Sequence, residues 1–331
     1  MINIIFHQKE KKMFKHEKII PISIPTPFAI GDVNIYLVKG EALTLIDVGP
    51  KTEAASAMLK NSLAEYRLTL DDIDQVVLTH HHADHVGLLD EFPDSVKIIG
   101  HMYNEPYISQ NPDFIKKQSA FFTYLFGQLG VPHHMISSRT VERSYRLSCQ
   151  RSLTQTIKEN DQIDGLEGWT VLETPGHATS HIVLYHEKSE RLIGGDLLLK
   201  TSSSNPLLEV PQQGEKRPLP LLDYLASINR LSELPLKVIF PGHGGQITGI
   251  QELIIRRLEK QQNRAEEVYD ILSEKTHTAF AICQKLFPTV YEKELFLTMS
   301  ETVGQLDYLQ ACNRIISEEI NGIYYYHSRQ G

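Results

Sequence analysis

The stretch that decides the fold is LTHHHADHVG, residues 78–87. It continues an apolar run, which predicts a buried strand that ends at the histidines. His80 and His82 occupy alternate positions and point the same way, and the next turn aims Asp84 and His85 at a neighbouring point. One tetrahedral ion could not use four such side chains and keep a position for water, so the cluster indicates two metal ions side by side. The alternative is a solvent-exposed, histidine-rich turn, which is the ordinary interpretation of a single histidine.

Residues 79–87 resemble the His-x-His-x-Asp-His signature of the metallo-β-lactamase-fold metallohydrolases, which include glyoxalase II and several nucleases and lactonases. The resemblance covers about residues 20–245. It implies an α/β fold, the four-layer αββα metallo-β-lactamase sandwich, with a helical, winged-helix-like appendage as in the lactamase-beta-like branch. We accordingly predict a flexible N-terminal extension at 1–14, a catalytic domain at 15–249 and a C-terminal helical domain at 250–331.

A second motif, TPGHATSH, covers residues 174–181. It sets His177 on a tight Pro-Gly turn at a strand end, and such a turn holds the side chain rigidly. The motif resembles the family's Thr-Pro-Gly-His, which implies that His177 is the third ligand of the first metal. His181 lies four residues further on, where it either assists by hydrogen bonding or simply begins the next strand.

Two further strand ends complete the series that the family implies. Residues 194–196, Gly-Gly-Asp, would alone be a common turn, but as the fourth motif in order they imply that Asp196 bridges both metals. The two glycines permit close backbone approach. The sequence PGHGG at 241–245 then supplies His243. The implied ligands are His80, His82 and His177 on one ion, Asp84, His85 and His243 on the other, and Asp196 between them.

The opening strands also resemble those of the family, at residues 34–38 and 45–49. In the family the aspartate of the second segment supports the site without binding metal, which implies this role for Asp47. A turn residue before Gly49 is an equally good interpretation from the sequence alone.

The implied constellation predicts hydrolysis. Two divalent ions that share a water lower its pKa from about 15.7 towards about 7, so a metal-bridging hydroxide is the expected nucleophile. Asp84, as both ligand and hydrogen-bond acceptor, would orient that hydroxide and is the predicted catalytic residue. Imidazole and carboxylate ligands admit zinc, iron and manganese, and we rank zinc first.

The composition limits the expected cellular location and the expected partners of the protein. The 331 residues are 41% hydrophobic and 22% charged, and no apolar run approaches the ~20 residues that span a bilayer. Three widely spaced cysteines and a start without a signal-peptide pattern favour a soluble protein of the reducing cytoplasm, with no membrane partner. The net charge of -8 argues mildly against nucleic acid and favours a small-molecule substrate.

Periodicity predicts several further elements in the first 250 residues. Residues 51–66 carry a helical apolar stripe, and 222–231 form an amphipathic helix. The aromatic-rich segment 101–126 is either a pair of helices that bury aromatic rings in a core or a lid over the metal cleft. Residues 197–220 are predicted to be an irregular loop beside the site.

The C-terminal part is predicted to be helical near 253–272, at 279–286 and at 302–316, with a closing strand at 323–326. Residues 251–331 contain nine basic and twelve acidic side chains. An acidic module is a poor clamp for nucleic acid, so we expect it to serve packing or homodimerisation.

The sequence favours a hydrolase of a small thioester, ester or lactone, of the glyoxalase II kind. A metal-dependent phosphodiesterase or endoribonuclease is the alternative, suggested by the winged-helix-like tail. A third interpretation is an iron-dependent, oxygen-using enzyme of the same fold, against which the intact second ligand set argues. A non-catalytic binding module would require lost ligands, and none is lost.

Overall fold

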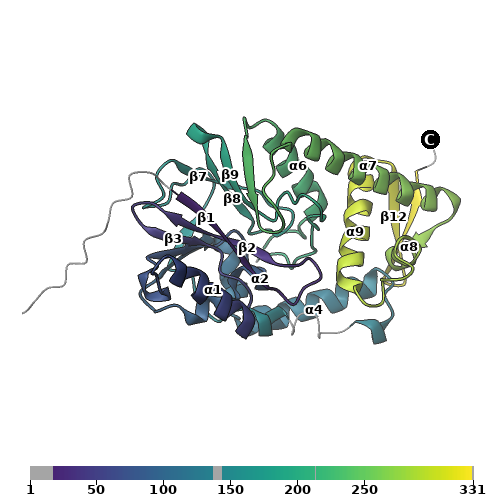
Figure 1. The fold of residues 1–331 in the computed structure, drawn as a ribbon. Helices are drawn as coiled ribbons and strands as arrows, with labels where there is room; N and C mark the ends of the chain where they lie inside the picture. The colour runs from purple at the N-terminus through teal and green to yellow at the C-terminus, as the bar shows by residue number, and fades with distance from the viewer. Residues whose placement is uncertain (1–17, 137–143, 213, 330–331) are drawn as a thin grey trace, which may run out of the picture.

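The computed structural model describes residues 18–136, 144–212 and 214–329. The extension predicted for residues 1–14 lies outside these described residues. Two sheets face each other across a shared core, helices cover their outer sides, and the C-terminal helices lie at one end of the molecule (Figure 1). The predicted α/β fold with a helical appendage is confirmed.

The first sheet has six strands in chain order. β1 to β3 form an antiparallel meander, whereas β3 to β6 are parallel. The carboxyl ends of these parallel strands therefore lie along one edge, where the loops after them can meet. The strands are β1 (Lys18–Ile24), β2 (Val33–Lys39), β3 (Leu43–Ile46), β4 (Gln75–Val77), β5 (Lys97–His101) and β6 (Gln155–Ile157).

The two faces of this sheet bury different side chains of the same strand. Along β2, Ile35 and Leu37 belong to the core beneath α1 (Glu53–Glu65), whereas Tyr36 and Val38 belong to the core between the sheets. This alternation is the period of two that a strand imposes. Because burial of each such side chain contributes about 1.5–3 kcal/mol, a slip of one residue would be strongly destabilising.

The second sheet has the order β10-β9-β8-β7. Its strands are β7 (Trp169–Glu173), β8 (Ile182–His186), β9 (Arg191–Gly195) and β10 (Val238–Pro241). β9 and β10 are parallel, and the helix α6 (Pro220–Ser232) lies between them in sequence. Buried residues of α6 pack on the outer face of this sheet, which completes a helix-sheet-sheet-helix sandwich.

The aromatic-rich segment contributes two α-helices of different length. The described residues place here α3 (Glu105–Ile108) and α4 (Pro112–Gln128), after the short α2 (Ala83–Val86) of the histidine stretch. Phe122 and Phe126 of α4 contact Phe296 of the C-terminal part, with ring centroids 5.1 and 6.4 Å apart. These rings therefore lie in a core, as one of the two interpretations held, and that core is shared with the C-terminal helices.

The C-terminal part combines three helices with a small antiparallel sheet of order β11-β13-β12. Its elements are α7 (Ile250–Glu274), β11 (His277–Thr278), α8 (Ala279–Leu286), α9 (Leu295–Ala311), β12 (Ile315–Ile320) and β13 (Ile323–Ser328). The predicted helix at 302–316 is wrong at both ends. Asn313 adopts the left-handed φ of 57°, which ends α9 and frees the chain to enter β12.

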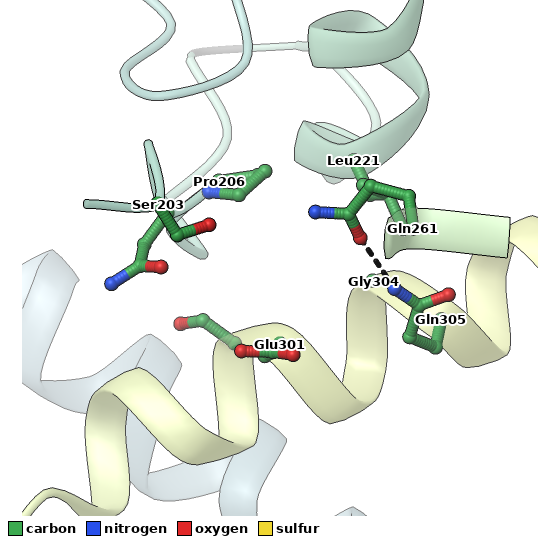
Figure 2. A pocket seen from close by; sticks show the side chains of 9 residues that line it. Ser203, Pro206, Leu221, Gln261, Glu301, Gly304 and Gln305 are labelled. Carbon is green, nitrogen blue, oxygen red and sulfur yellow. Dashed lines mark hydrogen bonds between the residues drawn. The ribbon is translucent and has the colours of Figure 1, made fainter. Parts of the chain in front are cut away.

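A small hollow marks where the C-terminal helices meet the loop between β9 and α6 (Figure 2). We call this loop, described at 197–212 and 214–219, the β9–α6 loop. In the hollow Gln305 donates from Nε2 to Oε1 of Gln261 at 2.7 Å. Its volume of about 10 Å³ is room for roughly one water, so no substrate fits there.

Candidate metal centre

The predicted ligands lie where strands of both sheets end. β4 ends at Val77, the chain bends at Thr79, and α2 begins after His82, whose own backbone is extended. The side chains of His80 and His82 meet beyond this bend, and α2 carries Asp84 and His85 within one turn. All four of these polar residues follow a wholly buried strand, so the fold itself delivers them to the seam between the sheets.

We call His80, His82 and His177 the first group. The Nε2 of His80 lies 3.0 Å from the Nδ1 of His82, and the His177 ring centroid lies 4.9 and 4.6 Å from theirs. His177 arrives from the second sheet through the tight turn at Gly176, whose φ is 137°. A Cβ at Gly176 would collide with the backbone of Tyr224, so this turn requires glycine.

We call Asp84, His85 and His243 the second group. The Oδ2 of Asp84 lies 3.3 Å from the Nε2 of His243 and 4.0 Å from the Nε2 of His85. His243 follows β10, and the peptide before it is held by Asn34, whose backbone N donates to the carbonyl of Gly242 at 2.6 Å. The first and second sheets thus each contribute side chains to this group.

Asp196 lies between the two groups. Its Oδ1 is 3.6 Å from the Nε2 of His85, and its Oδ2 is 3.5 Å from the Nε2 of both His177 and His243. The packing here is tight, because a Cβ on Gly242 would overlap Asp196 Oδ1 and stand 3.0 Å from His85 Cε1. One carboxylate thus faces histidines of both groups.

Outer hydrogen bonds fix which nitrogen faces the centre in three of these histidines. The Nδ1 of His177 donates to the carbonyl of Asn205 at 3.0 Å, and the Nδ1 of His243 donates to the carbonyl of Asp32 at 2.8 Å. The Nδ1 of His85 contacts the carboxylate of Asp47 at 2.8 Å. Because these oxygens only accept, each Nδ1 carries a proton, and Nε2 is the nitrogen that faces the centre.

Several inward atoms have no hydrogen-bond partner within the described residues. They are the buried Nε2 atoms of His85, His177 and His243 and the Oδ1 of Asp196. A buried polar atom left without a partner is costly, and four that converge on one small volume indicate a cation. Within each of the two groups, the ligand atoms of the three side chains lie within 4.8 Å of one another. This donor set is compatible with divalent metal ions.

Burial and neighbouring charges prepare these residues to bind metal. Burial, with His177 beside it, lowers the pKa of His82 to about 3, and burial with His85 holds the pKa of His80 well below its usual range. Burial would also lower the pKa of His85, but carboxylates led by Asp196 raise it well above that range. Burial would raise the pKa of Asp196, yet His85 and its neighbours hold it far below normal. The first group is therefore neutral and Asp196 ionised, the forms that bind metal.

Asp47 and His181 lie outside this inner set. Asp47 accepts from the backbone N of Thr79 at 2.8 Å and from its hydroxyl at 2.7 Å, besides its contact with His85. The Nε2 of His181 accepts from the backbone N of Asp196 at 3.0 Å, and its Nδ1 lies 2.8 Å from the hydroxyl of Thr174. His181 thus hydrogen-bonds the backbone of the central carboxylate, and it also directly precedes β8.

Other residues at the centre escaped the sequence interpretation. The carbonyls of Asn205 and Asp32 give no side-chain signal, because any residue carries one. Glu209 and Tyr107 lie against His81 at the edge of the first group, where the Tyr107 and His81 rings stack with centroids 3.6 Å apart. The one available clue was a single carboxylate inside the apolar run at 207–210.

The fold and this centre together define a class of protein. Residues 29–243 match the model of the metallo-beta-lactamase superfamily, and the chain belongs to that family. The predicted recognition is confirmed.

Individual relatives share most of the chain. It is 58% identical over 311 residues to the probable metallo-hydrolase YqjP of Bacillus subtilis, which covers 93% of this chain and 98% of that protein. It is 22% identical over 247 residues to the atrochrysone carboxyl ACP thioesterase of Aspergillus fumigatus, covering 74% of this chain and 61% of the relative. A crystal structure of a metallo-beta-lactamase family protein from Thermus thermophilus matches with a TM-score of 0.79 and 28% identity, over 94% of this chain and 98% of that one.

Among the described residues, the helices are all too short or too polar to cross a membrane.

Proposed function

We propose that this protein is a dinuclear metal-dependent hydrolase that acts on a small thioester, ester or lactone. The observation that carries the proposal is the convergence of the first and second groups on Asp196, whose two oxygens face histidines of both. Two divalent ions bound there would lower the pKa of a shared water towards about 7 and so supply hydroxide at neutral pH.

The two carboxylates of the centre, Asp196 and Asp84, differ in their exposure to solvent. Asp196 is shut away, with 4% of its side chain exposed, whereas 13% of the Asp84 side chain is exposed. Of these two carboxylates, Asp84 is therefore the one that a substrate can reach. The Asp84 carboxylate can accept a hydrogen bond from the attacking water and orient it, which is the catalytic role we propose for it.

The substrate class rests on charge and on one relative. The fungal thioesterase shows that a protein similar to this chain acts on an acyl thioester. The net charge of -8, and the twelve acidic against nine basic residues of 251–331, disfavour a nucleic-acid polyanion. A small acyl compound is the better match.

Zinc is the metal we propose, because imidazole nitrogens and carboxylate oxygens at a buried, compact site suit it. Elemental analysis of the purified protein tests this directly, with iron and manganese as the competing results. Oxygen consumption measured on the same sample separates hydrolysis from an oxygen-using iron enzyme.

The activity is tested with a panel of acyl-thioester, lactone and aryl-ester substrates, with single-stranded RNA as the competing substrate. We expect turnover of one acyl class by metal-loaded protein, loss of that turnover on chelation, and its absence from His82→Ala. If fully metal-loaded protein turns over no member of the panel, the proposal is wrong. RNA cleavage that persists in His82→Ala would indicate a contaminant.

A further inference from the structure

The β9–α6 loop reaches the first group at two points. The carbonyl of Asn205 accepts from the Nδ1 of His177 at 3.0 Å. Four residues on, Glu209 is buried, with 6% of its surface exposed, although it is a carboxylate. Burial of a carboxylate costs free energy unless the group is paired or hydrogen-bonded, so the burial of Glu209 needs an explanation.

Glu209 contacts both segments that carry the first group. Its Oε1 accepts from the backbone N of Thr179 at 3.0 Å, two residues after His177. The same oxygen lies 3.9 Å from the Nε2 of His81, the residue directly before His82. Its Oε2 accepts from the hydroxyl of Tyr107 at 3.5 Å. Glu209 therefore lies at the joint between the segment of His80 and His82 and the segment of His177.

The neighbours of Glu209 are themselves fixed. His81 stacks on Tyr107 with their rings 16° from parallel, and its Nδ1 lies 2.9 Å from the hydroxyl of Ser180. Ligand-type atoms of His81, His82 and Glu209 lie within 4.8 Å of one another. A buried carboxyl group thus lies close to a histidine of the first group.

The C-terminal part holds the loop in this place. Arg257 of α7 donates through Nη2 to the carbonyls of Leu199 and Ser202, each at 2.7 Å. The hydroxyl of Ser300 in α9 accepts from the backbone N of Leu208 at 3.2 Å, one residue before Glu209. The location of the carboxylate is therefore set by helices outside the two-sheet sandwich.

We propose that Glu209 is a positioning residue for the first metal ion. It fixes the separation of the two segments that carry the first group, and it places a buried carboxyl group beside His82. Replacement of an outer residue that supports metal ligands typically changes metal affinity about 10–100-fold. This inference rests on the proposed function, because it requires a metal at the first group.

The test first disables one metal-binding group at a time by substitution, and then replaces Glu209 in each of the two backgrounds. His243→Ala leaves the first group intact, and His82→Ala leaves the second. In the His243→Ala protein we expect Glu209→Gln to weaken Co²⁺ binding about 10–100-fold, measured by competition with a chromophoric chelator. We also expect an altered visible absorption spectrum of the bound Co²⁺, which reports its ligand geometry. In the His82→Ala protein, Glu209→Gln should leave Co²⁺ affinity unchanged.

The chain offers a matched control in Glu215. It lies in the same loop and its Oε1 accepts from the hydroxyl of Tyr103 at 2.8 Å, as Glu209 accepts from Tyr107. Glu215→Gln should leave both Co²⁺ affinities and both spectra unchanged. If Glu209→Gln does not fold, Glu209→Asp takes its place, because the shorter carboxylate cannot reach Thr179 and Tyr107 together.

Three results would overturn the inference. Co²⁺ affinity and spectrum at the first group that are unaffected by Glu209→Gln would remove any positioning role. Equal weakening at both groups would indicate a general loss of structure. A third ion in the unsubstituted protein that is lost with Glu209→Gln would make Glu209 a ligand. If instead His243→Ala protein binds no Co²⁺ and His82→Ala has no effect on metal content, the proposed function fails, and this inference with it.

Discussion

The Oδ2 of Asp47 contacts the Nδ1 of His85 at 2.8 Å and also accepts from the hydroxyl of Thr79 at 2.7 Å. The hydroxyl uses its only proton on Asp47, so its oxygen is left to accept from the Nδ1 of His80, 3.0 Å away. A single carboxylate therefore orients one histidine directly and a second through threonine.

This relationship predicts the effect of Asp47→Asn. Asp47 has the left-handed φ of 61°, which asparagine tolerates better than most residues, so the fold should survive. We expect affinity for the second metal to fall about 10–100-fold, because His85 loses its ionised partner. Zinc content after dialysis against a weak chelator measures this. Asp74→Asn is the control, because it replaces a carboxylate that accepts a backbone N–H at the other end of β4. If the Asp47→Asn protein retains both ions, the prediction is refuted.

Gly242→Ala should damage the centre without unfolding the chain. The added Cβ would overlap Asp196 Oδ1 and press on His85, so the carboxylate must leave its place between the groups. We expect loss of at least one metal ion and of turnover, with little change in thermal unfolding of the metal-free protein. Gly245→Ala is the matched control, since its Cβ would meet no atom within 4 Å. Equal metal content in the two variants would contradict the overlap argument.

The residues that converge on Asp196 could be predicted from the sequence because their pattern is local. Each one ends or follows a strand, and imidazole and carboxylate at fixed spacing have few other uses. Glu209 could not be found this way, because its partners Thr179 and Tyr107 are distant in sequence and meet it only after both sheets have packed. The carbonyl of Asn205 gave no signal at all.

The fold shows the same division between local and distant causes. The alternation in β2 and the stripe of α1 could be predicted, because each follows from the period of one element. The end of α9 was missed, since its apolar pattern runs on into β12 and the left-handed Asn313 carries no unique signature. The core shared by Phe122 and Phe296 depends on contacts between distant segments, which periodicity does not encode.

Arg257 should matter more for stability than its neighbour Arg256. Its guanidinium donates to the carbonyls of Leu199, Lys200 and Ser202, which have no strand to pair with. Hydrogen bonds to a charged group contribute about 1.5–3 kcal/mol, so Arg257→Gln should lower the free energy of unfolding by about that amount. Arg256 is exposed on the same helix, and Arg256→Gln should have little effect. Urea unfolding of both variants measures this difference. Equal midpoints of unfolding for the two variants would contradict the proposed role of Arg257.

Glu209 should make the stability of the metal-free protein depend on pH. Burial raises its pKa from 4.5 to about 7, so the folded chain holds this proton more tightly than the unfolded chain. Below 4.5 both states bind the proton and the residue has no net effect. Between 4.5 and about 7 the unfolded chain releases it first, so stability falls as pH rises through this window, by about 3 kcal/mol in total.

The neutral variant Glu209→Gln lacks this proton and isolates the effect, because every other titrating group is common to both proteins. In the presence of a chelator, the free energy of unfolding of Glu209→Gln relative to the parent should increase by about 3 kcal/mol between about pH 4.5 and about pH 8. Urea unfolding at the two pH values measures the difference. If the difference does not depend on pH, the Glu209 carboxyl has the same pKa in the folded and unfolded chains, and the prediction is wrong. Burial would then not disfavour the ionised form of Glu209, and a bound cation would have no such penalty to compensate.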